Sequence, residues 1–306
     1  MVFRLAEGVK VNERAVSGEM DLKLLAPAKV NLFLKVVGRR VDGYHDILSL
    51  IQPISLYDEL RLGISDGEGI EVFCDNPGVP GGKGNLACRA AEAFLREVGL
   101  KRRITIHITK RIPVGAGLGG GSSDAASVLM GLNEALGTGL DGRRLREMAL
   151  GLGSDVPFFL LGTPALASGR GEVLEPVELP SYSYVLLNPG FSVSTAWVYN
   201  NLDLTKIREN NKLIDLKESV KTFMKEPPGV MDCLENDLEA VTSGRYPAIV
   251  GMERVLREAG ADGVLMSGSG PTVFGIFLDE RRAQDAYSAL KSRLVQPHWV
   301  FVAKGL

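Results

Sequence analysis

A glycine-rich loop carries the clearest chemical signal in this sequence. Five of the seven residues from Gly115 to Gly121 are glycine. Glycine adopts positive φ readily and lets the backbone approach a ligand closely, so consecutive N–H groups can surround an anion. The loop precedes a predicted helix, whose positive N-terminal end favours phosphate. We therefore predict a phosphate-binding loop that consists of Pro113, Val114, Gly115, Ala116, Gly117, Leu118, Gly119, Gly120, Gly121, Ser122 and Ser123.

Three common types of nucleotide-binding loop fit this segment less well. Gly115-x-Gly117-x-x-Gly120 matches the dinucleotide fingerprint. That motif needs a strand with a terminal acidic residue after the helix, whereas residues 141–153 look helical. No Gly-Lys-Ser/Thr closes a Walker loop, and the His-Arg-Asp and Asp-Phe-Gly triplets of protein kinases are absent from the sequence. A flexible turn without a ligand is the simplest alternative, but the loop lies between a strand and a helix.

Four side chains outside the glycines could contribute to chemistry on a phosphate. Ser122 and Ser123 could cap the helix, bind phosphate oxygens or hold a metal ion. Phosphoryl transfer also needs an acceptor for the proton of the attacking hydroxyl. Asp155 has apolar neighbours that could partly desolvate it and make it a stronger base, although a helix N-cap is its simpler role. Lys29 lies in an apolar strand and needs a partner or a cleft there, unless it faces the surface.

The elements that position these residues can be predicted from periodicity and turn residues. Residues 1–19 show no clear period and are expected to form a loose extension. Asn85 is predicted to cap a helix that runs to Val98 and is closed by Gly99, and another helix is predicted over 122–136. Strands are predicted over 24–37, 47–56, 59–64, 70–74 and 103–110, and the last of these alternates isoleucine with polar residues.

The sequence pattern changes after about residue 171, where prolines separate short predicted strands. Residues 202–228 are charged and are predicted to be helical or loop-like. Helices are predicted over 235–243, 246–259 and 281–294, and strands over 264–266, 272–278 and 299–303, with a second glycine turn between the first two strands. Helices and strands are mixed without regular βαβ alternation, so we predict an α+β fold with a domain boundary near residue 175.

Composition narrows the possible functions. The chain has 306 residues, 45% of them apolar and 24% charged, with a formal net charge of −2. This balance provides no global positive field for nucleic acid or an anionic membrane, and no apolar run is long enough to span a bilayer. Three well-separated cysteines and three histidines do not suggest a zinc site or a disulfide framework. A reducing cytoplasm is the expected location.

Several motifs together resemble a known family. The loop is similar to the ATP-binding motif of the GHMP kinases. Pro27-Ala28-Lys29-x-Asn31-Leu32-x-Leu34, then Gly38-Arg39-Arg40-x-Asp42-Gly43-Tyr44-His45, resembles the 4-diphosphocytidyl-2-C-methyl-D-erythritol kinases within that superfamily. Gly153-Ser154-Asp155-Val156-Pro157 and Leu265-Met266-Ser267-Gly268-Ser269-Gly270 resemble later motifs of the same enzymes. The similarity runs from about Leu24 to about Leu278.

The resemblance implies a fold and an activity. The expected fold has two GHMP kinase-like domains with the active site in the cleft between them: residues 20–175 form the ATP-binding N-terminal domain, residues 176–306 form the C-terminal domain, and residues 1–19 form an extension. ATP with Mg²⁺ would phosphorylate the 2-hydroxyl of a small cytidine diphosphate substrate in non-mevalonate isoprenoid biosynthesis. Lys29 and Asp155 would be the catalytic pair, and Asn31, Tyr44 and His45 would bind the substrate.

Some details stay open at this level. Ser267-Gly268-Ser269 could lie near the phosphates or be only a tight turn. Tyr199 or Phe191 could stack on the second face of the cytosine. No acidic Mg²⁺ ligand is indicated by its spacing. Another GHMP kinase, of the homoserine or mevalonate type, and a non-catalytic nucleotide sensor on the same fold are the alternative functions. Met20 is either the native start or follows a dispensable arm.

Overall fold

The chain forms two compact units in a computed structural model, which describes residues 10–12, 20–203, 217–218, 220, 222, 229–294 and 298–306. The first unit comprises the described residues within 1–28, 57–114 and 119–162, and the second unit those within 29–56, 115–118 and 163–306. Helices and strands are mixed in both units, which confirms the predicted α+β class.

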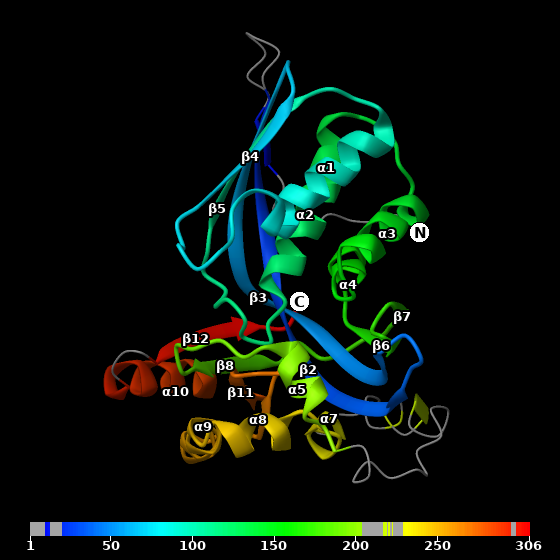
Figure 1. Cartoon of the computed structure of the whole chain (residues 1–306). Helices are drawn as coiled ribbons and strands as arrows, with labels where there is room; N and C mark the ends of the chain where they lie inside the picture. Colours follow the sequence, from blue (N-terminus) through cyan, green and yellow to red (C-terminus); the bar gives the residue numbers. More distant parts are fainter. Residues whose placement is uncertain are drawn as a thin grey trace. The chain divides into compact units, whose positions relative to one another are not determined.

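The first unit is a sheet with helices packed on it. Its strands belong to a sheet of order β1-β2-β3-β5-β4, in which residues 29–39 of β2 and 45–56 of β3 are part of the second unit. The last residues of β3 pair with β5 in an antiparallel manner, and β4 pairs with β5 in parallel. Helix α1 contacts β4, β5 and α2, and α1 and α2 lie side by side in Figure 1. The bounds are β1 Lys10–Asn12, β2 Met20–Arg39, β3 His45–Ser65, β4 Gly69–Cys74, β5 Arg103–Thr109, η1 Gly82–Gly84, α1 Leu86–Val98, α2 Gly120–Ala135, α3 Gly142–Leu152 and α4 Val156–Leu161.

Local sequence signals explain most of this unit. The side chain of Asn85 accepts a hydrogen bond from the Ala87 N–H, and Gly99 closes α1 with a φ of +65°. Both ends of this helix are therefore as predicted. The isoleucines of β5 are buried while its alternate residues are more exposed, which also confirms the period-2 pattern.

Two predictions for the N-terminal part are wrong. Residues 47–56 and 59–64 are not separate strands, because β3 runs through them without a turn. Asp58, which lies between these two segments, is fully buried and accepts backbone hydrogen bonds. Residues 10–12 are not part of a loose extension, since they pair with residues 21–23 as strand β1. The remainder of 1–19 lies outside the described residues.

The second unit contains a four-stranded sheet of order β10-β11-β8-β12, in which all neighbours are antiparallel. Helices α9 and α10 pack on this sheet (Figure 1) and bury Leu256 and Leu290 against it. The first part of β3 pairs with β6, and β6 pairs with β7. The bounds are β6 Ala165–Gly169, β7 Val173–Pro176, β8 Ser183–Asn188, α5 Thr195–Asn200, α7 Gly229–Asp232, β9 Glu235–Asn236, α8 Glu239–Arg245, α9 Ala248–Glu258, β10 Gly263–Met266, β11 Val273–Phe277, α10 Glu280–Arg293 and β12 Trp299–Lys304.

The helix predicted over 235–243 is wrong at its start. Glu235 and Asn236 form the short strand β9, which pairs in parallel with β2, and the helix begins only at Glu239. The prediction for 202–228 falls mostly outside the described residues. Within the part of the chain that the structure describes, no helix combines the length and the apolar character needed to cross a membrane.

Candidate active site

Lys29 lies in the second unit on β2, with only 5% of its surface exposed. Its Nζ donates a hydrogen bond of 2.5 Å to Oδ1 of Asn31, two residues along the strand and therefore on the same face. The Nδ2 of Asn31 in turn donates to the Ser49 hydroxyl at 2.8 Å. A buried ammonium is stable only when it is hydrogen-bonded, and the carboxamide of Asn31 provides part of that support.

The second glycine turn packs directly beside Lys29. Gly268 and Gly270 have positive φ, and Gly270 N–H closes the turn on the Ser267 carbonyl at 2.9 Å. A Cβ on Gly268 would lie 3.3 Å from the Nζ of Lys29. The sequence left open whether this segment is a tight turn or lies close to the site. It is a tight turn, and it also contacts the predicted catalytic lysine.

A buried asparagine holds this turn in place. The Nδ2 of Asn236 donates to the carbonyls of Met266 and Gly268, both at 2.8 Å. Sequence reasoning missed Asn236, because it placed the residue inside a helix. The Asn-Asp pair before an apolar helix start was a weak signal for a bend, but nothing local indicated which carbonyls the side chain binds.

The predicted phosphate-binding loop has the backbone that its glycines suggest. Gly115, Gly117 and Gly119 have φ values of +61°, +76° and +73°, a region that non-glycine residues rarely occupy. In the second unit, Lys29 N–H donates to the Leu118 carbonyl at 3.0 Å. The hydroxyl of Ser267 donates to the Gly117 carbonyl at 3.0 Å and accepts from the Asn31 N–H at 3.3 Å. Ser267 therefore connects the loop to β2.

The serines at the end of the loop are not helix caps. Helix α2 begins at Gly120, with Gly119 at its N-cap position, so Ser122 and Ser123 lie inside its first turn. The start two residues earlier than predicted follows from the left-handed conformation of Gly119. The Ser123 Oγ is buried and has no hydrogen-bond partner among the described residues.

The side chains present fit a Mg²⁺ ion only in a limited way. The described residues contain no group of three or more His, Cys, Asp or Glu side chains that could hold a metal. The Ser123 hydroxyl is an orphaned oxygen of the type that Mg²⁺ prefers. Because Mg²⁺ keeps several waters and is commonly held by phosphates and one or two protein oxygens, these serines are compatible with such a site.

Asp155 lies in the first unit at the N-cap position of α4, with Pro157 in the first turn. Its side chain makes no capping hydrogen bond to the helix, unlike Asp141, whose carboxylate caps α3 by accepting from the Arg144 N–H at 2.8 Å. Capping therefore does not occupy the Asp155 carboxylate. Lys29 belongs to the second unit, and the pairing of the two residues stays a prediction.

Tyr44 and His45 follow a tight turn at the start of β3 in the second unit. The Asp42 carboxylate accepts from the Tyr44 N–H at 3.1 Å, and Gly43 has a φ of +86°. His45 stacks on Tyr199 with ring centroids 5.1 Å apart, and the Arg170 guanidinium lies 4.8 Å from the centre of the Tyr44 ring. Burial, with a smaller contribution from Arg39, lowers the pKa of His45, so the neutral imidazole is favoured near neutral pH.

The other aromatic residue considered for the base, Phe191, packs against the same apolar cluster as Tyr199. Phe191 packs on Tyr246 with centroids 4.8 Å apart and joins an apolar cluster around Leu34 and Val198.

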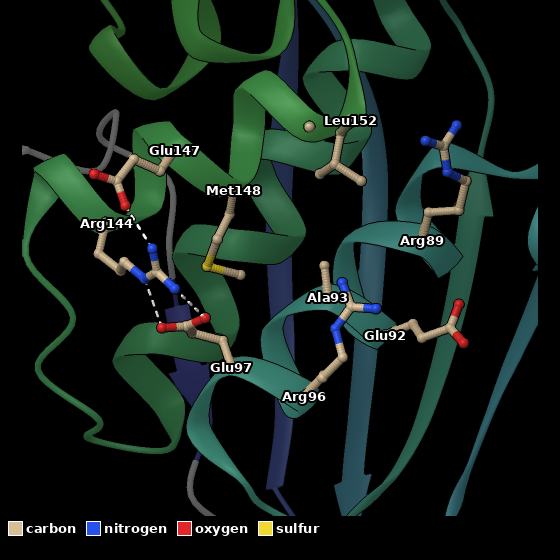
Figure 2. Close-up of a pocket in the computed structure, with 10 residues that line it drawn as sticks. Arg89, Glu92, Ala93, Arg96, Glu97, Arg144, Glu147, Met148 and Leu152 are labelled. Carbon is tan, nitrogen blue, oxygen red and sulfur yellow. Dashed lines mark hydrogen bonds and ion pairs between the residues drawn. The ribbon is translucent and has the colours of Figure 1, made fainter.

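A groove between α1 and α3 in the first unit contains none of the predicted site residues (Figure 2). Three arginines and three glutamates line most of it. Arg144 is paired there with Glu97 at 2.6 Å and Glu147 at 2.5 Å, as the dashed lines in Figure 2 show. These pairs are partly exposed and contribute little free energy individually. The groove offers no nucleophile or isolated base and is not a candidate active site.

Models of known protein families match residues in both units. The model of the GHMP kinases N terminal domain matches residues 85–163, and that of the GHMP kinases C terminal domain matches residues 224–296. The chain is 51% identical to a 4-diphosphocytidyl-2-C-methyl-D-erythritol kinase of Geobacter sp. (strain M21) over 88% of this chain and 94% of the relative. It is also 51% identical to the enzyme of that name from Geobacter sulfurreducens over 89% and 95%.

Solved structures show the same similarity. A crystal structure of 4-(cytidine 5'-diphospho)-2C-methyl-D-erythritol kinase superposes with a TM-score of 0.74 and 38% identity, covering 93% of this chain and 99% of that one. Homoserine kinase from Cytophaga hutchinsonii superposes with a TM-score of 0.70 but only 19% identity, over 96% and 97% of the two chains. The second match therefore concerns the fold alone.

Proposed function

The chain belongs to the GHMP kinases and, within them, to the 4-diphosphocytidyl-2-C-methyl-D-erythritol kinases, and we propose that it transfers the γ-phosphate of ATP to the 2-hydroxyl of 4-diphosphocytidyl-2-C-methyl-D-erythritol. The observation that carries this proposal is the identity of 51% over 88% of the chain to an enzyme of that name. The product would be an intermediate of non-mevalonate isoprenoid biosynthesis. The 19% identity to homoserine kinase gives no comparable support to the alternative kinases.

The glycine loop is proposed to bind the phosphates of ATP. Its positive-φ glycines allow close approach of the backbone, and α2 begins immediately after Gly119 with its positive dipole end toward the loop. We expect Mg²⁺ to accompany the nucleotide, with Ser122 or Ser123 providing a hydroxyl ligand. When bound, the ion would neutralise the charge that develops on the transferred phosphoryl group.

The proposed chemistry uses Asp155 and Lys29. Asp155 would accept the proton of the substrate hydroxyl as its oxygen attacks the γ-phosphorus, while the bond from that phosphorus to the bridging oxygen breaks and ADP leaves. Support for this role comes from a carboxylate that is not used for capping. Lys29 would keep Asp155 ionised and stabilise negative charge near the hydroxyl. The hydrogen bond from its Nζ to Asn31 orients the ammonium.

Tyr44 and His45 are proposed to bind the cytidine end of the substrate. Tyr44 is 53% exposed, so its ring is available to stack on a base. A neutral His45, held against Tyr199, has one donor and one acceptor nitrogen for the edge of the cytosine. Asn31 was predicted to bind substrate as well; its contacts with Lys29 and Ser49 support a contribution through the orientation of the lysine.

We further propose that the enzyme works in a reducing cytoplasm and on small molecules rather than nucleic acid. Its three cysteines, Cys74, Cys88 and Cys233, are free thiols, as expected in such a compartment. The net charge of −2 provides no general attraction for a polyanion.

Turnover with matched substrates tests the function. Release of ADP should require ATP together with the cytidine diphosphate substrate, and it should stop when that compound lacks its 2-hydroxyl. Homoserine and mevalonate should give no turnover. Phosphorylation of either, or ATP binding without turnover of any of these compounds, would assign the chain to one of the alternative functions instead.

A further inference from the structure

Three buried charged residues of the first unit have no part in the proposed chemistry. Asp58 on β3 is 0% exposed, and the side chains of Lys110, just after β5, and Asp124, on α2, are each 5% exposed. The Nζ of Lys110 contacts Oδ2 of Asp58 and lies 3.0 Å from Oδ2 of Asp124. One ammonium therefore joins a strand to the helix that follows the glycine loop.

Asp58 also holds the residues that lead into the loop. Its Oδ1 accepts from the N–H of Arg111 at 2.7 Å and from that of Ile112 at 2.9 Å. These are the two residues before Pro113. Lys110 is fixed through its own backbone as well, since its N–H donates to the Asp75 carboxylate at 2.9 Å. The main chain is thus anchored over three successive residues.

The first turn of α2 lies against two of these side chains, Lys110 and Asp58. A Cβ on Gly120 would lie 3.1 Å from Nζ of Lys110 and 3.2 Å from Oδ2 of Asp58. The φ of Gly120 is not in the left-handed region, so it is this close approach that favours glycine here. One turn further along, Asp124 is bound to Lys110. Both the start and the end of the loop therefore contact one cluster.

Stability alone is a weak explanation for such a cluster. Burying ionised groups is costly, and buried ion pairs are often no more stabilising than apolar side chains of similar size. This cluster holds two carboxylates and one ammonium, an unbalanced set, and burial raises the pKa of Asp124 to about 7 in spite of Lys110. What the ions provide that apolar residues cannot is a directional connection between the two ends of one loop.

We propose that Asp58, Lys110 and Asp124 form a positioning unit that holds the two ends of the glycine loop at the separation needed to bind the phosphates of ATP. This inference rests on the proposed role of the loop in nucleotide binding. The three residues touch the loop ends rather than the reacting atoms. Their loss should therefore weaken nucleotide binding more than it affects the cytidine substrate.

Asp124→Ala is the primary test. It cuts the connection to α2, leaves the balanced Asp58–Lys110 pair, and introduces the best helix former into α2, so the protein should fold. We expect the Kd for ATP to rise about 10- to 150-fold, the range for losing a charge-assisted hydrogen bond, with the Kd for the cytidine substrate unchanged within about twofold. Asp124→Asn, which keeps an acceptor oxygen, should recover part of the loss.

Two control variants separate positioning from general destabilisation. Glu59→Gln replaces a carboxylate with an amide at the residue next to Asp58. Glu59 forms an ion pair with Arg111 at 2.5 Å, and this pair is more exposed than the cluster of Asp58, Lys110 and Asp124. Val128→Ala removes two methyl groups from the buried face of α2 and should lower the melting temperature. Both should leave the Kd for ATP within about twofold of the wild-type value, measured by calorimetry well below each melting temperature.

Asp58→Asn provides a second, independent test, because its Nδ2 would face either the Lys110 ammonium or the N–H groups of Arg111 and Ile112, and it can accept a hydrogen bond from neither. The proposal is overturned if folded Asp124→Ala and Asp58→Asn both bind ATP within about twofold of wild type. It is also overturned if their affinities for the two substrates fall in parallel, as a general loss of folding would cause. Because binding is measured directly, this outcome is distinct from a failure of the proposed kinase activity, which would appear as absence of turnover.

Discussion

At the scale of single residues, the two predicted catalytic side chains have different surroundings. Lys29 is buried and hydrogen-bonded to Asn31, with Gly268 against it. Asp155 is at a helix N-cap but its carboxylate does not cap the helix. The Asp155 carboxylate is therefore not used for capping, and each of the two residues can be tested on its own and together with the other.

Asp155→Asn should reduce kcat by about 100- to 10,000-fold, the usual contribution of a general base. The amide has the same shape but cannot accept the proton, so the melting temperature and the Kd for ATP should stay close to wild type. Asp141→Asn is the matched control, because it makes the same change at a helix N-cap that does use its carboxylate. A decrease in kcat smaller than about tenfold would exclude Asp155 as the base.

Lys29→Ala should also be severe, and its effect should not add to that of Asp155→Asn. If the two groups act as a unit, removing either one removes most of what the pair contributes. The measurement is a double-mutant cycle on kcat/KM with all four proteins under one condition. Losses that simply multiply in the double variant would refute the coupled pair.

His45→Ala should raise the KM for the cytidine substrate by about 5- to 150-fold and leave the KM for ATP unchanged. Losing a neutral hydrogen bond that leaves its buried partner unpaired costs about 1–3 kcal/mol. The variant should also discriminate less between cytidine and uridine forms of the substrate. His107→Ala is the control, since His107 likewise stacks on an aromatic ring, Phe73, with centroids 4.9 Å apart. An unchanged base preference would remove His45 from the cytosine site.

At the scale of elements, the two glycine turns of the second unit depend on each other. Ser267 bonds to the Gly117 carbonyl, and a Cβ on Gly117 would lie 2.0 Å from the Ser267 carbonyl oxygen. The backbone of Gly117 can approach the Ser267 carbonyl so closely only because residue 117 has no Cβ. The conformation of the first loop is therefore set partly by the second.

Gly117→Ala should raise the Kd for ATP by about tenfold or more, because it adds this clash to the cost of about 1–2 kcal/mol for a left-handed non-glycine residue. Gly137→Ala separates the two effects. Gly137 also has a positive φ, of +56°, but a Cβ there would meet nothing within 4 Å. The Gly137→Ala variant should lose some stability and keep the wild-type affinity for ATP. Equal ATP affinities in both variants would show that the packing of the two turns does not matter for binding.

At the scale of the whole molecule, a buried acid makes stability depend on pH. Burial, together with the nearby Glu253, raises the pKa of Glu239 from 4.5 to about 7, although its Oε2 accepts a hydrogen bond from the Met266 N–H at 2.8 Å. The folded protein therefore keeps a proton on Glu239 up to about pH 7, whereas the unfolded chain releases it above about pH 4.5. This contribution to stability is complete below pH 4.5 and is lost as the pH rises toward 7.

Compared with Glu239→Gln, the wild-type free energy of unfolding should therefore fall between pH 4.5 and 7 by up to about 1.4 kcal/mol per pH unit. Glutamine keeps an acceptor for Met266 and does not titrate. Urea unfolding at four or five pH values measures the difference, and Glu258→Gln, which makes the same change in an exposed pair with Arg254, is the matched control. A difference that is constant over this range would contradict the assigned protonation.

Features encoded over a few residues could be predicted from the sequence. The cap of α1 by Asn85, its closure at Gly99, the alternation of β5 and the positive φ values in the glycine loop all follow from local sterics and hydrogen bonding. The family and its activity could be predicted too, because several motifs occur in a specific order. The predicted bounds of helices and strands were less accurate where a side chain binds a distant segment, as those of Asn236 and Asp58 do.

Only the tertiary structure decided how these motifs support one another. Ser267 and Gly117 are 150 residues apart, and Ser267 and Asn31 are 236 apart, yet one hydroxyl bonds to both. Asp58 and Asp124 share Lys110 because β3, β5 and α2 bring them together. The physical reason is the range over which each interaction acts. Preferences for φ and helix caps depend on residues within about one turn. The partner of a buried polar group depends on the packing of the whole chain, which local sequence does not specify.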